Sequence, residues 1–181
     1  MASSLVLCFT LALAGLAVSN PYSNNPQNKP IDPIHAIRDR YNAINKNIRR
    51  YKTVKKSLSG FSAEGGELVA HLDKKVIVKM VATYYGETGR SIEEYYYSNG
   101  ELIFVFRKQL NYDRPLTGKV VSSEQHRFYF DAHKLIKWIN QDGKEVPSTD
   151  DEFSKQQQEF LENSELLLKG AHAKADTIEA P

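Results

Sequence analysis

The segment Ser98-Asn99-Gly100-Glu101 constrains the fold more than any other part of this chain. Asn-Gly is the preferred pair for a two-residue type I′ turn, because both central residues of that turn need a positive φ. The residues on either side alternate in the way that strands do, and many are aromatic or β-branched. The turn therefore predicts a β-hairpin in which Ile92–Tyr97 pairs with Leu102–Arg107.

A two-residue turn also predicts the register of this hairpin, because side chains alternate between the two faces of a strand. In that register Tyr95 lies opposite Phe104 on one face of the sheet. Tyr96 lies opposite Ile103 on the other face. The hairpin therefore presents aromatic or aliphatic side chains on both of its faces.

The hairpin pattern recurs along the chain. Phe128–Ile136 repeats the character of Tyr95–Ile103 at nearly every position, and Leu68–Val81 is a weaker version turned at Asp73-Lys74. Three hairpins in series predict a six-stranded antiparallel meander.

Helical patterns flank this meander on both sides. Asp32 is a suitable N-cap, and Pro33 suits the first helical position. Apolar residues then recur every three or four positions up to Leu58, which predicts a long amphipathic helix packed on the sheet. A second helix is expected from Ser148 to about Lys169. The expected fold is therefore α+β, with both helices placed on one face of the meander.

The first nineteen residues predict a cleaved secretory signal peptide. They carry no charged side chain, and the apolar run Leu5–Val18 is too short to cross a bilayer as a stable helix. Cleavage is expected near Ser19/Asn20, which predicts a secreted or periplasmic protein. Further expected boundaries are a flexible linker over 20–32, a single α+β domain over 33–170 and a frayed tail over 171–181.

Charge is distributed unevenly although the net charge is only +2. Residues 34–58 contain eight basic side chains and one acidic side chain, whereas residues 148–181 contain eight acidic and three basic ones. Export and the acidic second helix argue against a nucleic-acid partner. A weak attraction of the basic helix to an anionic membrane surface remains an alternative.

Two aromatic hairpin segments also carry a family resemblance. Ser91–Phe106 and Glu124–Trp138 together resemble a pattern in uncharacterised exported bacterial proteins, which have repeated Tyr/Phe-rich hairpins with Asn-Gly-type turns. The resemblance covers roughly residues 34–139, and this chain departs from it at Ala132-His133, where an Asn-Gly-like turn is usual. The resemblance implies export and carries no assigned activity.

No motif in the sequence predicts catalysis, a metal site or a cofactor. The five histidines lack the close spacing of metal ligands, although His126 and His133 face each other across a predicted hairpin. Glu93 and Glu94 are adjacent, so on a strand they point to opposite faces and do not form a catalytic pair. The alternative is a hydrolase whose site is assembled from the loops Tyr84–Arg90 and Leu110–Gly118.

The sequence favours a non-enzymatic binding module that uses an aromatic sheet face. Ten tyrosines are present, and most lie in or beside the predicted sheet. Such residues suit ordinary sheet packing, but an exposed aromatic face with a cation suits a partner. The predicted partner-binding residues are Tyr96, Arg107, Tyr129 and Trp138. The expected partner is an extracellular protein, a peptide or a glycan, and the opposite assignment of the two faces stays open.

Overall fold

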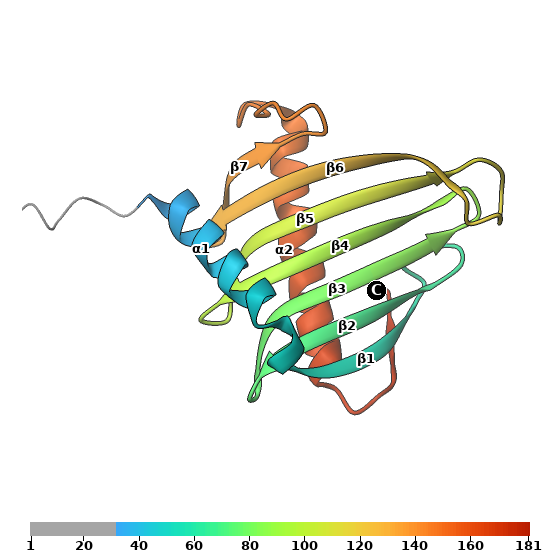
Figure 1. Cartoon of the computed structure of the whole chain (residues 1–181), viewed down its shortest axis with the longest axis horizontal. Coiled ribbons are helices and arrows are strands. Elements are labelled where there is room, and N and C mark those ends of the chain that lie inside the picture. Colours follow the sequence, from blue (N-terminus) through green and yellow to red (C-terminus); the bar gives the residue numbers. More distant parts are fainter. Residues whose placement is uncertain (1–31) are drawn as a thin grey trace, which may run out of the picture. The chain divides into compact units, whose positions relative to one another are not determined.

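The computed structural model describes residues 32–181, which are built around one eight-stranded sheet with the order β7-β6-β5-β4-β3-β2-β1-β8 (Figure 1). The signal peptide expected over 1–19, and all but the last residue of the linker expected over 20–32, lie outside the described residues. The elements are α1 (Pro33–Lys46), a 3₁₀ turn (Ile48–Arg50), β1 (Lys52–Ser59), β2 (Gly66–Asp73), β3 (Val76–Gly86), β4 (Gly89–Ser98), β5 (Glu101–Tyr112), β6 (Val120–Asp131), β7 (Lys134–Ile139), α2 (Asp151–His172) and β8 (Thr177–Glu179).

The two helices cover opposite faces of this sheet. In Figure 1, α1 crosses in front of the strands at one end, and α2 runs behind them. α1 contacts β5 and β6, whereas α2 contacts β1, β2, β5, β7 and β8. The prediction of an α+β fold with a largely antiparallel sheet is confirmed. The placement of both helices on one face is wrong, because both faces of the central strands are apolar and each face needs its own cover.

The prediction of a long N-terminal helix is wrong in its length. The helix begins as expected, with the Asp32 carboxylate accepting a hydrogen bond from the Ile34 backbone N–H at 3.0 Å. It ends at Lys46, however, and Lys52–Ser59 forms β1. Val54 and Leu58 fit a helical spacing, but Val54, Lys56 and Leu58 also alternate as a strand requires. Pairing with β2 buries Lys56 and Leu58 and so decides between the two periods.

The predicted numbers of strands and hairpins are also wrong, because β1 and β8 bring the sheet to eight strands. The tail expected to fray carries β8, which pairs in parallel with β1 so that Ile178 lies beside Leu58. Ile178 is buried against Gly170 of α2, where an added Cβ would meet the Ile178 Cδ1 atom at 2.4 Å. The buried Lys56 ammonium donates to the backbone carbonyls of Ala173 and Ala175 at 2.9 and 2.5 Å. These contacts hold the tail on the sheet.

Two of the β-bulges in this sheet change the register around the predicted site residues. Asn99 and Gly100 both have positive φ, as the predicted turn requires. Tyr97 then pairs with Leu102 as expected, but Tyr96 pairs with Phe104, so that Ile103 is an extra residue. The other bulge lies in the hairpin of β6 and β7, where Ile136 is the extra residue. Each bulge moves the following side chains of its strand to the face opposite the one predicted.

The buried residues form one core on each face of the sheet. The larger core lies under α2 and contains Phe128, Phe130 and Phe160. The smaller core lies under α1 and contains Ile37, Ile44, Val78, Tyr96, Phe104 and Tyr129. The sheet is thus buried under both helices, and the part of its front face beyond α1 carries half-exposed side chains.

Candidate functional site

The four predicted binding residues do not share one face of the sheet. Tyr96 and Tyr129 belong to the core under α1, where their exposed fractions are 0% and 6%. Arg107 and Trp138 lie on the other face, beside α2. The bulges at Ile103 and Ile136 explain this separation, because each reverses the direction of the side chains that follow it. The surface predicted from the unbulged register does not form.

A cluster of aromatic rings replaces that predicted surface on the α1 side. Tyr41 of α1 packs on Tyr96 and Phe104, with ring centroids 4.8 and 5.4 Å apart. Phe104 in turn packs on Tyr129 at 4.9 Å. Such tilted and edge-on arrangements are favourable for aromatic pairs. Ile37 and Ile44, one helical turn from Tyr41 on either side, fix the helix on this cluster.

A groove of about 310 Å³ opens where α1 meets β5 and β6. We call it the α1 groove, and its lining residues are Ile37, Arg38, Tyr41, Asn42, Phe104, Phe106, Arg127 and Tyr129. Its wall is therefore mostly aromatic and aliphatic. A pocket of this size accommodates one large side chain or a comparable group.

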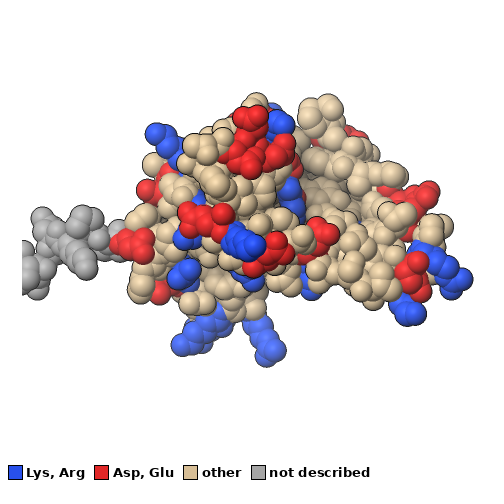
Figure 2. All heavy atoms as spheres, turned by 90° about the horizontal axis from the view of Figure 1, so that it is seen from above, with Lys and Arg blue, Asp and Glu red and all other residues tan. Residues whose placement is uncertain are grey.

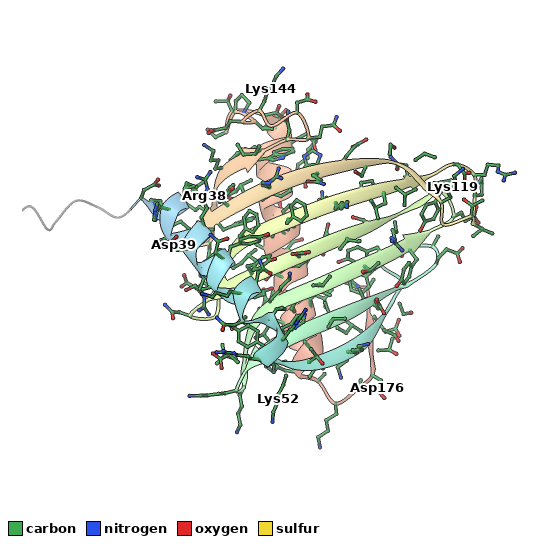
Figure 3. All side chains as sticks on the ribbon, in the orientation of Figure 1. Arg38, Asp39, Lys52, Lys119, Lys144 and Asp176 are labelled. Atoms are coloured by element: carbon green, nitrogen blue, oxygen red, sulfur yellow. The ribbon has the colours of Figure 1, made fainter. Side chains whose placement is uncertain are left out.

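Two arginines from different elements border the α1 groove. The Arg38 guanidinium carbon lies 6.0 Å from the centre of the Tyr129 ring, and that of Arg127 lies 5.5 Å from the centre of the Phe106 ring. Figure 3 shows Arg38 on α1, and Figure 2 shows basic side chains projecting from the lower border, which is the α1 side of the molecule. Stacking on a ring holds a guanidinium in place while leaving its N–H groups free to bind.

Neither arginine is neutralised by an acidic group of the chain. The ion pairs among residues 32–181 do not include Arg38 or Arg127. Asp39, the acidic residue of α1, pairs with His35 at 3.1 Å, and residues 1–31 contain no Asp or Glu. The sequence does not indicate Arg38 or Arg127 as site residues. Arg38 looks like the other basic residues expected on the solvated face of the helix. Arg127 borders a groove only where α1 packs beside β6.

The adjacent glutamates point to opposite faces, as predicted, and each binds a tyrosine and a cation. Glu93 accepts hydrogen bonds from the Tyr95 hydroxyl at 2.5 Å and from Arg107 Nε at 2.7 Å. Glu94 accepts a hydrogen bond from the Tyr96 hydroxyl and pairs with Lys79 at 2.7 Å. Burial and the Glu94 charge raise the pKa of Tyr96 well above its usual value. Both tyrosines therefore stay neutral donors that hold these carboxylates.

Arg107, a predicted binding residue, is occupied by contacts within the chain. Besides Glu93, its guanidinium contacts Gln156 at 2.7 Å and Glu159 at 2.5 Å, and both of these residues belong to α2. Burial opposes the charge of Arg107, but the two glutamates outweigh it and raise its pKa. A cleft of about 420 Å³ opens beside this cluster. The geometry assigns Arg107 to fastening α2 on the sheet.

Trp138 and His126 form a hydrogen-bonded pair on the same face. The Trp138 indole N–H donates to His126 Nδ1 at 3.1 Å, and Trp138 also packs on Phe128 with ring centroids 5.1 Å apart. His126 therefore carries its proton on Nε2 when it is neutral. Burial, assisted by the nearby Arg107 charge, lowers the pKa of His126 from its usual value. The two histidines expected to face each other are separated, since His133 lies in the turn and contacts Glu101 at 3.8 Å.

Acidification is expected to change the fluorescence of Trp138, the single tryptophan of the chain. Protonation of His126 at Nδ1 removes the acceptor of the indole N–H, with a midpoint below the unperturbed value of 6.5. Because the folded protein disfavours the charged ring, the contribution of neutral His126 to the free energy of unfolding is fully present above about pH 6.5. It is lost as the pH falls below that value. A fluorescence titration checks this. His126→Gln should abolish the transition, whereas His172→Gln, at an exposed position, should not; a transition that survives in His126→Gln would refute the assignment.

The loops of the hydrolase alternative lie side by side at one end of the sheet. The Tyr112 backbone N–H donates to the Thr88 carbonyl at 2.8 Å, and that of Leu116 donates to the Glu87 carbonyl at 2.7 Å. Among residues 32–181, the side-chain hydrogen bonds of these two loops do not join one loop to the other; Thr117 donates to Asp113 at 2.5 Å, and Asn111 donates to Ser122 of β6 at 3.0 Å. Among residues 32–181, no three His, Cys, Asp or Glu side chains are grouped as metal ligands would be.

Fold and site together define an α+β protein with one helix on each face of an eight-stranded sheet and an aromatic, arginine-bordered groove beside α1. In the described part of the chain, no helix is both long and apolar enough to span a membrane. No family model, curated protein or solved structure matches this chain. The resemblance to exported proteins with Tyr/Phe-rich hairpins therefore stays a prediction.

Proposed function

We propose that the chain is an exported, non-enzymatic binding module that recognises an acidic peptide segment through the α1 groove. One observation carries this proposal: Arg38 and Arg127 border the same aromatic groove, and no acidic side chain of the described residues pairs with either. The export part of the proposal rests on the apolar segment Leu5–Val18.

The chemistry of the groove indicates the kind of segment that fits. Guanidinium groups bind carboxylates through two parallel hydrogen bonds, and an aromatic wall binds an apolar side chain. The preferred segment therefore has a large apolar side chain next to a carboxylate. A glycan would need more neutral polar groups than the groove offers, because among residues 32–181 only Asn42 and the hydroxyls of Tyr41 and Tyr129 supply them in its lining.

Binding of the probe peptide acetyl-Gly-Phe-Asp-Gly-amide tests the proposal. In an NMR titration of the labelled protein, shift changes are expected in α1, β5 and β6. The same peptide with Asn in place of Asp should bind about tenfold more weakly, because hydrogen bonds to a charged group are stronger than those to an amide. Equal binding of the two peptides, or shift changes elsewhere only, would contradict the proposal.

Substitutions on the groove give the second arm of this test. Arg127→Gln keeps a long polar side chain and removes the charge, so the Asp peptide should bind about tenfold more weakly. Arg114→Gln makes the same change at an exposed position of the β5–β6 loop and should leave binding unchanged. Substituting Tyr96 or Tyr129 is not a clean test, since both side chains are buried and their loss would destabilise the fold.

A further inference from the structure

A second cavity lies on the other face of the sheet, between α2 and the ends of three hairpins. Its volume is about 800 Å³. We call it the hairpin-end cavity, and its lining residues are Lys75, Val76, Ile77, Tyr97, Gly100, Leu102, His133, Leu161, Ser164, Glu165, Leu168, Lys169 and His172. In Figure 1 the C-terminal end of α2 reaches the same end of the sheet as the turn between β2 and β3.

The inner wall of the hairpin-end cavity is apolar. Ile77 and Leu102 are buried in the sheet, and Leu161 and Leu168 of α2 are half-buried opposite them. The exposed surface of the lining is accordingly more apolar than polar. A cavity of this size and lining suits a flexible apolar chain.

Ser164 lies in the wall of the cavity. It occupies a core-facing position of α2 where an aliphatic residue is usual, and its exposed fraction is 4%. Its hydroxyl lies 2.9 Å from the Tyr97 hydroxyl, so both buried polar groups are paired. A serine side chain is smaller than those of Leu161 and Leu168, which line the same cavity.

The rim of the cavity is basic. Lys75, from the turn between β2 and β3, and Lys169, from the last turn of α2, are both exposed, as are His133 and His172. Among the lining residues that the structure describes, Glu165 is the one acidic residue. An apolar interior below a basic rim complements a molecule with a chain at one end and a negative charge at the other.

We infer that the hairpin-end cavity binds a single-chain amphiphile with an anionic head group, such as a fatty-acid carboxylate. The alkyl chain lies against the leucines of α2 and the buried side chains of β3 and β5, and the head group lies near Lys75 and Lys169. This inference goes beyond the peptide site, because the cavity and the α1 groove share no lining residue.

Calorimetric titration with decanoate, below its micelle concentration, tests the inference. We expect saturable 1:1 binding that weakens as the salt concentration rises. Decanol and decyltrimethylammonium have the same chain with a neutral and a cationic head, and each should bind at least several-fold more weakly. Equal affinity for the three probes, or no saturable binding of decanoate, would overturn the inference.

Charge-reversal variants locate the head group without disturbing the core. Lys75→Glu with Lys169→Glu should weaken decanoate binding about tenfold, since each exposed charge contributes modestly. Lys119→Glu with Lys144→Glu makes the same change in net charge at two other positions (Figure 3). This control pair should leave decanoate binding unchanged. An equal loss of decanoate affinity in the two charge-reversal pairs would refute the placement of the head group near Lys75 and Lys169.

The proposals of a peptide site and of an amphiphile site can be tested independently of each other. Arg127→Gln should leave decanoate binding unchanged, because Arg127 does not line the hairpin-end cavity. Leu168→Trp should weaken decanoate binding by filling the cavity and should leave the Asp peptide unaffected. Loss of decanoate binding in Arg127→Gln would overturn the inference by moving the amphiphile to the α1 groove.

Discussion

Phe160→Ala is expected to lower the free energy of unfolding by about 3–5 kcal/mol, which is the usual cost of deleting a buried aromatic ring. Phe160 is fully buried at the centre of the α2 core. Its ring packs on Phe128 with centroids 4.5 Å apart and contacts Tyr95 and Phe130 edge-on. The Arg107 guanidinium carbon also lies 4.4 Å from the ring centre. Truncation therefore leaves a cavity where the helix meets three strands.

Urea unfolding followed by circular dichroism measures this loss. Val121→Ala serves as the control, because Val121 is 59% exposed and its truncation should change stability by less than about 0.5 kcal/mol. A loss below about 1.5 kcal/mol in Phe160→Ala would mean that α2 is not docked on the sheet in this way, since even partial relaxation rarely recovers more.

Arg107→Met is expected to cost a similar amount, about 3–5 kcal/mol, for an electrostatic reason. The substitution keeps an apolar side chain of comparable length but leaves Glu93, which is 4% exposed, without its cation. It also removes the contacts with Gln156 and Glu159 that join β5 to α2. A buried carboxylate without a partner accounts for most of the expected loss.

A double variant separates this explanation from a simple loss of packing. Glu93→Gln in the Arg107→Met background removes the unpaired charge and keeps an acceptor for the Tyr95 hydroxyl. Its stability should therefore exceed that of Arg107→Met alone, by a difference measured in a double-mutant cycle. A double variant less stable than Arg107→Met would contradict the electrostatic account. Arg114→Met, at an exposed position, should be close to neutral.

The start of α1 and the turn at Asn99-Gly100 could be predicted from the sequence because each depends on local chemistry. The Asp32 carboxylate caps the helix, and a positive φ at both turn residues suits Asn-Gly. The end of α1 could not be predicted in the same way. The apolar spacing of residues 51–58 fits a helix and a strand, and the choice depends on pairing with β2.

The bulges explain why the candidate site could be predicted only in part. Nothing in the local sequence marks Ile103 or Ile136 as an extra residue of its strand. Of the predicted residues, Tyr129 lines the α1 groove, whereas Arg107 and Trp138 lie on the opposite face of the sheet. The groove itself needs α1 and β6 together, and no local pattern predicts that contact.

The three-residue strand β8 has a consequence for how this protein behaves at high concentration. An outer strand with free backbone groups is a template on which other chains add, so long outer strands promote aggregation. Here β1, which has eight residues, is shielded along Ser57–Ser59 by β8. The Lys56 ammonium keeps the connecting segment in place. The C-terminal residues therefore cover part of an outer strand on which another chain could add, and a chain that lacks them would expose Ser57–Ser59 of β1 as well.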